Sequence, residues 1–205
     1  MEKKMNKKHL PLFAAICLSA AVFISCGSTK VASNLEKVYV TNTTKVDVLP
    51  VDAIFPEFEK YQQFQGTFGD TTLNALAYIQ AGPTGIDVLL MNDFGGEIGS
   101  ISYDGANAKL DSSVFPKKLK AEYIILDLQN AYADTQKLKE HYSKYDLEFC
   151  EIKTNISTKD GGGFSVAERA IAKDGKVIET ISIGNGVVTI KNLLRGYEYK
   201  LTASE

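Results

Sequence analysis

Histidine and cysteine are scarce in this sequence of 205 residues, which contains two of the former and three of the latter. These residue types supply many metal ligands and catalytic groups, so little material exists for a metal site or a histidine-dependent enzyme. Positive charge is not in excess, because 23 Lys and Arg stand against 25 Asp and Glu. The net charge of −2 excludes a basic field for nucleic acid. A hydrophobic content of 44% excludes a disordered chain.

Residues 1–25 have the arrangement of a secretory signal peptide. Four lysines precede an apolar run from Leu10 to Ile24, and a small residue, Ser25, stands at its exit. Fifteen helical residues would reach only about 22 Å, short of the ~30 Å hydrocarbon core of a bilayer. The run is therefore interpreted as a cleaved signal and not as a membrane span.

The exit of this segment, Val22 to Cys26, resembles the lipobox of bacterial lipoproteins, with Phe23 at a position where Leu is usual. The resemblance implies cleavage before Cys26 and covalent attachment of lipid to this residue, with no other cofactor. Gly27, in place of the Asp that retains lipoproteins in the inner membrane of enteric bacteria, favours the outer membrane. The alternative is an ordinary signal peptide with a chance cysteine.

Cleavage would leave residues 26–36 as a lipidated cysteine with a flexible tether and residues 37–205 as one domain. Four lysines and Glu2 would be lost, so the net charge would change from −2 to −5. The other cysteine of the mature chain, Cys150, lies in an alternating run and is predicted to be a half-buried strand thiol.

Short segments that alternate apolar and polar residues recur at roughly ten-residue spacing, which predicts antiparallel strands. We expect them at residues 38–43, 59–68, 72–79, 86–90, 98–103, 106–110, from 147 onward, 164–172, 176–182, 187–193 and 197–203. Asp174-Gly175 predicts a two-residue hairpin. Apolar residues at helical spacing predict helices at 117–132, after Pro116, and at 134–144, with Asp134 as N-cap.

The order of strands, two helices and more strands predicts a single α+β domain. A long antiparallel sheet tends to curl, and helices on its concave side would enclose an apolar interior. The residues expected to line this cavity are Leu73, Ile79, Val88, Leu90, Ile101 and Leu110.

Two segments carry a resemblance to known proteins: residues 98–104, Ile-Gly-Ser-Ile-Ser-Tyr-Asp, and residues 126–132, Leu-Asp-Leu-Gln-Asn-Ala-Tyr. With the element order and the lipobox, they resemble the lipoprotein-localisation factors LolA and LolB. They resemble more closely an uncharacterised lipoprotein family often encoded beside aryl-polyene lipid genes, which usually has Leu and Trp where Asn130 and Tyr132 stand. The resemblance implies an incomplete β-barrel with a helical lid over a cavity for acyl chains.

Residues 89–95 resemble the LolB strand and loop that carries a protruding apolar residue. The resemblance implies that Phe94 inserts into a membrane, although Asp93 replaces a proline of that loop. An exposed aromatic side chain at a turn suits a bilayer interface. The alternative is that Phe94 folds back over the barrel rim.

Catalytic patterns are weak. Gly163 to Ala167 looks faintly like a nucleophile elbow, but its Ser165 lies at a strand start, and His141 precedes it on a predicted helix. The carboxylates, Asp127 among them, are interpreted as parts of solvated faces. We therefore expect neither an enzyme nor a metal protein.

The sequence predicts an envelope protein, anchored by lipid to the outer membrane and facing the periplasm, that binds acyl chains as an acceptor or carrier. Its partners would be membrane lipid, and lipoproteins or a periplasmic carrier, with the oligomeric state left open. The alternative is a structural or assembly lipoprotein that binds a protein partner through a sheet edge. An open apolar cavity of several hundred Å³ would favour lipid, and a filled interior would favour the alternative.

Overall fold

The computed structural model describes residues 35–54, 56–117, 119–157 and 162–204, which belong to one compact unit, Ser33–Glu205. Cys26, the signal segment and most of the expected tether lie outside the described residues. The hydrophobic core lies within this compact unit.

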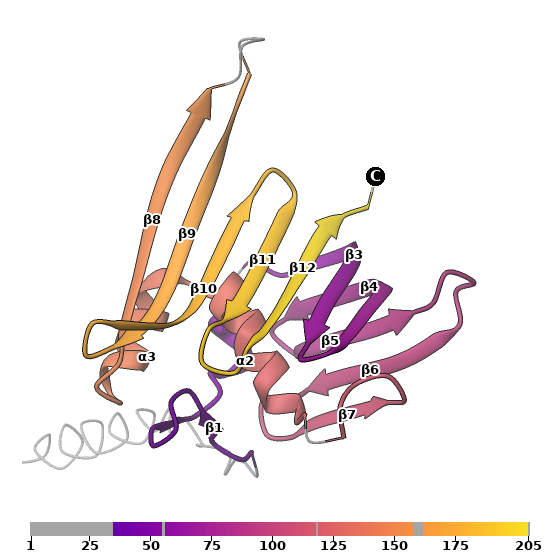
Figure 1. The fold of residues 1–205 in the computed structure, drawn as a ribbon, viewed down its shortest axis with the longest axis horizontal. Helices are drawn as coiled ribbons and strands as arrows, with labels where there is room; N and C mark the ends of the chain where they lie inside the picture. The colour runs from indigo at the N-terminus through magenta and orange to yellow at the C-terminus, as the bar shows by residue number, and fades with distance from the viewer. Residues whose placement is uncertain (1–34, 55, 118, 158–161, 205) are drawn as a thin grey trace, which may run out of the picture. The chain divides into compact units, whose positions relative to one another are not determined.

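One antiparallel sheet of ten strands forms most of the fold (Figure 1). The first half contains β3 (Phe58–Phe68), β4 (Thr71–Gly82), β5 (Gly85–Met91), β6 (Glu97–Tyr103) and β7 (Ala108–Ser112). The second half contains β8 (Glu148–Ser157), β9 (Gly163–Lys173), β10 (Lys176–Gly184), β11 (Val187–Asn192) and β12 (Tyr197–Ala203). The two meanders join where β3 pairs with β12, as in Phe64 opposite Leu201.

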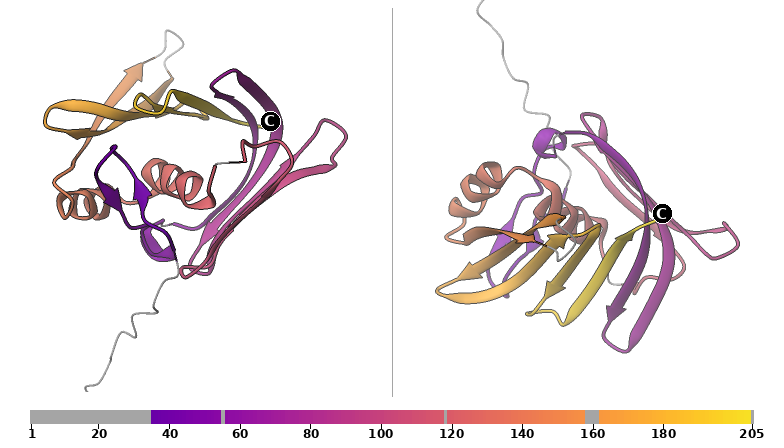
Figure 2. Two further views of the ribbon diagram at one scale, coloured as in Figure 1. Left: turned by 60° about the horizontal axis from the view of Figure 1, so that its bottom comes forward. Right: turned by 90° about the horizontal axis from the view of Figure 1, so that it is seen from above.

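The sheet is curved and open, and both helices lie on its concave side (Figure 2). Its edges are β7 and β8, which do not pair with each other within the described chain. The prediction of an α+β domain with a curved antiparallel sheet is confirmed at this level, and the sheet does not close into a barrel. Alternation along β4 buries Ala75, Ala77 and Ile79 on the concave face, as predicted.

The predicted turn at Asp174-Gly175 is confirmed. Both residues have positive φ, 50° and 73°, as a type I′ turn requires. Cys150 lies on the edge strand β8, but it is exposed and not half-buried, because its side chain is on the face of the sheet away from the helices.

Two short strands precede the sheet, β1 (Val38–Tyr39) and β2 (Lys45–Val46), which pair with each other. The prediction of one strand over residues 38–43 is therefore wrong beyond Tyr39. The cause is Thr41, whose hydroxyl accepts hydrogen bonds from the backbone N–H groups of Thr43 and Thr44 and turns the chain. A short 3₁₀-helix, η1 (Val51–Ala53), follows.

The helices are α2 (Ala121–Tyr132) and α3 (Thr135–Ser143). Helix α2 begins later than predicted, because a backbone hydrogen bond from Leu119 to Pro116 forms a separate turn and Lys120 is extended. Asp134 is the N-cap of α3, as predicted, and its carboxylate accepts hydrogen bonds from the backbone N–H groups of Gln136 and Lys137.

Helix α2 is a core helix and not an exposed lid. Nine of its twelve residues are buried, Asp127, Gln129 and Asn130 among them. Residues 45–54, which we call the strap, also contact α2 (Figure 2). The strap itself buries Val46, Leu49, Ala53 and Ile54. A helix that is buried on nearly every side must satisfy its polar side chains inside the fold.

Candidate functional site

The concave face of the sheet and α2 enclose a small apolar void of about 20 Å³. Its lining comes from the sheet, from α2 and from Phe115: Phe64, Ala77, Ile79, Val88, Leu90, Ile101, Phe115, Ile124, Leu128, Tyr199 and Leu201. This volume holds about one water molecule. The several hundred Å³ that would favour lipid are therefore not open here, because the side chains of Phe115, Ile124 and Leu128 fill the concave face.

Four of the six predicted lining residues, Ile79, Val88, Leu90 and Ile101, do line this void. Leu73 and Leu110 do not. Both are half-buried side chains that pack against the margin of the core. The strand alternation thus identified the correct face, while the position of each residue along its strand decides whether it reaches the centre.

Beside the void, α2 carries a buried polar cluster that connects it to β10, β11 and β12. Asp127 of α2 accepts hydrogen bonds from the hydroxyl groups of Tyr197, at 2.8 Å, and Tyr199, at 3.3 Å. Asp127 is only 4% exposed, so its interpretation as a solvated carboxylate is wrong. We call Asp127 and Glu179 the carboxyl pair, because both are buried side by side in the same polar cluster and neither forms an ion pair among the described residues.

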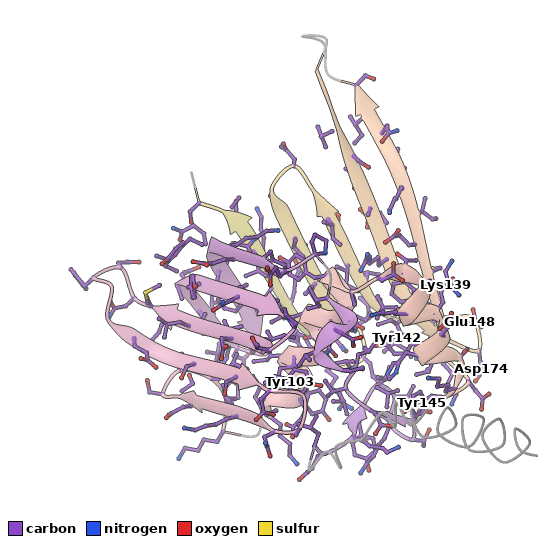
Figure 3. The ribbon with its side chains drawn as sticks, turned by 180° about the vertical axis from the view of Figure 1, so that it is seen from behind. Tyr103, Lys139, Tyr142, Tyr145, Glu148 and Asp174 are labelled. Carbon is purple, nitrogen blue, oxygen red and sulfur yellow. The ribbon has the colours of Figure 1, made fainter. Side chains whose placement is uncertain are left out.

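Two asparagines connect Glu179 to its neighbours. The amide groups of Asn130, on α2, and Asn192, on β11, donate to its two carboxylate oxygens at 2.9 and 3.1 Å. Tyr142, labelled on α3 in Figure 3, donates in turn to Asn130 Oδ1 at 2.7 Å. Both helices and three strands therefore share one hydrogen-bonded network.

Burial dominates the electrostatics of this network. It raises the pKa of Asp127 well above its ordinary value, and the charge of Glu179 raises it further. Burial also raises the pKa of Glu179 to about 7, although the hydrogen bonds from Asn130 and Asn192 act in the opposite direction. The pKa values of the tyrosine hydroxyl groups at 142, 197 and 199 are raised too, first by burial and then by the nearby carboxyl groups. Both carboxyl groups therefore keep their protons to higher pH than exposed carboxyl groups do.

The C-terminal end of α2 is held by Arg169 of β9. Its Nη1 donates to the carbonyl groups of Asn130, Ala131 and Ala133 at 2.8, 3.0 and 3.1 Å. Its Nε donates to Glu151 Oε2 at 2.6 Å. A guanidinium group at this end satisfies otherwise unpaired carbonyl groups and complements the helix dipole.

The strap fastens the opposite side of α2. The side-chain amide of Gln129 both donates to the carbonyl group of Leu49, at 2.8 Å, and accepts from its N–H group, at 2.9 Å. The Tyr103 hydroxyl group, at the end of β6 (Figure 3), donates to the same carbonyl at 2.6 Å. The strap, α2 and the sheet are thus joined through buried hydrogen bonds as well as apolar packing.

The family model described as "Protein of unknown function (DUF3261)" matches residues 59–205. The chain belongs to this family. The matched range includes the carboxyl pair, Arg169 and the void, whereas the strap precedes it. A comparison with curated proteins finds no match.

In this DUF3261 chain, Phe94 protrudes at the turn between β5 and β6 and is 97% exposed. The alternative in which it folds back over the sheet is therefore wrong. Asn92 shapes the turn, because its side-chain oxygen accepts from the N–H groups of Phe94 and Gly96. Gly95 has a φ of 76°, which favours glycine. These contacts of Asn92 and Gly95 hold Phe94 away from the core, although Asp93 stands where the LolB loop has a proline.

His141 of the DUF3261 chain is buried, and burial lowers its pKa. Ser165 is on β9, and no element brings His141 and Ser165 into a contact among the described residues. No group of three or more His, Cys, Asp or Glu suited to a metal ion occurs in the part that the structure describes. Within that part, no helix is long and apolar enough to cross a membrane.

The sequence analysis did not predict the carboxyl pair or the hydrogen bonds from Arg169 to the end of α2. Asn130 and Glu179 are 49 positions apart, and Asp127 and Tyr197 are 70 apart. The helical spacing could have indicated this cluster, because Asp127 and Asn130 are three residues apart and therefore neighbours on the helix surface. Most of the other residues of this helix are apolar, so the two polar side chains were candidates for burial together.

Proposed function

We propose that this protein is a lipid-anchored envelope protein that accepts an acyl chain between α2 and the concave face of the sheet. The observation that carries the proposal is the void between these layers, which is lined by apolar side chains and one tyrosine. Each buried CH₂ group would contribute about 0.8 kcal/mol, so a chain needs little polar recognition. The structure would then represent the closed, unloaded state, and α2 must shift to admit a chain.

In this proposal the protein has the incomplete-barrel architecture of LolA and LolB, and it resembles the lipoproteins encoded beside aryl-polyene lipid genes. Lipid on Cys26 anchors it to the outer membrane on the periplasmic side. It receives lipid or lipoprotein acyl chains from the membrane or from a periplasmic carrier. Binding requires no covalent step and therefore no catalytic residue.

Phe94 would enter the bilayer interface. Leu35 lies beside Tyr103 and Gly105, at the far end of β6 from Phe94. The seven residues of β6 span about 23 Å. Residues 26–34 can reach at most about 30 Å. The sequence between the anchor and the domain is therefore long enough for Cys26 and Phe94 to meet one bilayer.

The test compares two isosteric substitutions in a soluble chain of residues 27–205, which retains the whole compact unit. Val88→Thr places a hydroxyl group in the void, whereas Val188→Thr places one in the core away from it; the two valines are 6% and 5% exposed. A neutral fluorescent alkanol is the probe. We expect Val88→Thr to weaken binding roughly tenfold relative to Val188→Thr, because a buried hydroxyl group without a partner opposes an alkyl chain. Equal affinities, or no binding by the unmodified chain, would contradict the proposal.

A second candidate function is a structural or assembly lipoprotein that binds a protein partner. The small volume of the void and the burial of α2 favour it. Native mass spectrometry of the chain of residues 27–205, purified from bacteria in the presence of their membranes, separates the two. Copurified lipid supports the acyl-chain acceptor, and recovery of protein without lipid supports the assembly protein.

A further inference from the structure

Helix α2 is attached to the sheet in three places that differ in chemistry. Arg169 holds its C-terminal end, and its middle is held by Asp127 and Asn130. Its N-terminal end has no side-chain cap, and the N-cap residue, Lys120, forms an exposed ion pair with Glu36. Exposed pairs contribute little stability. Movement of α2 away from the sheet therefore depends on the attachment at its middle.

We propose that the carboxyl pair, Asp127 and Glu179, is a protonation-controlled latch that holds α2 against β10–β12 while its carboxyl groups are protonated and loosens that hold as they ionise. This inference rests on the proposed acyl-chain function, for which it supplies the regulation. It concerns the same void, because Tyr199 both donates to Asp127 and lines that void.

Among the described residues, the surroundings of the pair contain hydrogen-bond donors but no neutralising cation. Asn130 faces it from α2, Tyr142 from α3, Asn192 from β11, and Tyr197 and Tyr199 from β12. The nearby cations are engaged elsewhere, Arg169 with Glu151 and Arg195 with the carbonyl group of Tyr39. None of the ion pairs of the described chain includes either carboxyl group.

Negative charge suits this arrangement poorly. When the carboxyl groups are protonated, the asparagine and tyrosine side chains supply hydrogen bonds and no charge is buried. Each ionisation buries a charge without a neighbouring cation, and the second would bury two like charges in one cluster. Separation of α2 from the sheet would admit water to both groups and relieve this cost.

The direction of the effect follows from the pKa of Glu179, which is raised to about 7 from an ordinary value of 4.5. A group whose pKa is raised in the closed state stabilises that state below its ordinary pKa. The contribution is lost as pH rises from 4.5 through about 7. Hence α2 should be held firmly at acidic pH and loosely at alkaline pH.

Hydrogen exchange of the α2 amide groups tests the latch without any ligand. In the chain of residues 27–205, the opening constant, corrected for intrinsic exchange rates, should rise roughly tenfold or more between about pH 5.5 and about pH 8. Glu179→Gln should reduce this pH dependence, since only Asp127 of the pair can still ionise. The matched control is Glu168→Gln, at an exposed position on β9, which should retain the full pH dependence.

If Glu179→Gln does not fold, Asp127→Asn replaces it, because the asparagine oxygen can still accept the hydrogen bond from Tyr197. A pH dependence that is undiminished in these variants, or that is absent from the unmodified chain, would overturn the latch. Binding of the fluorescent alkanol at both pH values separates the two proposals. PH-dependent exchange without probe binding supports the latch and contradicts the acyl-chain function. Probe binding that is equal at both pH values, with pH-independent exchange, contradicts the latch alone.

Discussion

Arg169 offers the sharpest test of how α2 is held, because a single guanidinium group contacts three helix carbonyl groups and the carboxylate of Glu151. The side chains of Arg169 and Glu151 are only 10% and 6% exposed. Replacement of Arg169 by Met would keep the aliphatic packing, leave the carbonyl groups of Asn130, Ala131 and Ala133 without this donor, and strand the Glu151 charge. Loss of one partner of a buried ion pair costs about 3–5 kcal/mol.

A matched control is the second cation that contacts Glu151. Lys153 contacts Glu151 Oε1 at 3.0 Å, but its side chain is 66% exposed. Lys153→Met should therefore reduce the free energy of unfolding by less than about 1 kcal/mol. Urea unfolding followed by circular dichroism measures both variants, and it is preferred because guanidinium chloride would screen the ion pair.

The cost of Arg169→Met should also depend on pH. Burial alone would raise the pKa of Glu151, but hydrogen bonds from Lys153 and Thr135, together with the Arg169 charge, lower it below the ordinary 4.5. The stability from this pairing is present above pH 4.5 and lost as pH falls through the lowered value. The difference between Arg169→Met and the unmodified protein should shrink in acid, and Glu151→Gln should restore part of the loss at neutral pH. Equal effects of Arg169→Met and Lys153→Met would refute the reasoning.

The remaining predictions concern the anchor and the protruding turn. Phe94→Ser should leave the urea midpoint unchanged, because the side chain is 97% exposed, and should weaken binding of the soluble chain to phospholipid vesicles; Val177→Ser, at a position 40% exposed on β10, is the control. Unchanged vesicle binding would remove Phe94 from the membrane contact. Cys26→Ala should abolish incorporation of labelled palmitate in bacteria, whereas Cys150→Ala should not. Labelling that survives the first substitution would place the lipid on another residue.

The strands were predictable because alternation is a local signal. In β4 and β5 the buried side chains Ala77, Ile79, Val88 and Leu90 recur at every second residue, and turns with Gly mark the ends. The N-cap of α3 was predictable for the same reason, since Asp134 contacts N–H groups only two and three residues away. Such features depend on neighbours that the sequence shows directly.

The fastening of α2 depends instead on residues far away in the chain. Asp127 resembles a solvated carboxylate as long as its partners on β10 and β12 are unknown. Gln129 likewise gives no local sign that it pairs with the backbone of Leu49, 80 positions earlier. Burial of these groups is tolerable only because each finds hydrogen-bond partners, and those partners come together only when the second meander and the strap have packed against α2.

The strap lies, in sequence, between the proposed lipid anchor and the proposed acyl-chain site. Residues 45–54 follow the segment that leads from Cys26, and Leu49 is held by both α2 and β6. A chain that enters the void must displace α2 from β10–β12, and the Gln129 hydrogen bonds would carry the strap with it once the hydrogen bond from Tyr103 of β6 to Leu49 breaks. The C-terminal end of α2 would remain on β9 through Arg169. The strap and α2 would then move as one layer about that end, so that loading of the site and the position of the tether become mechanically connected.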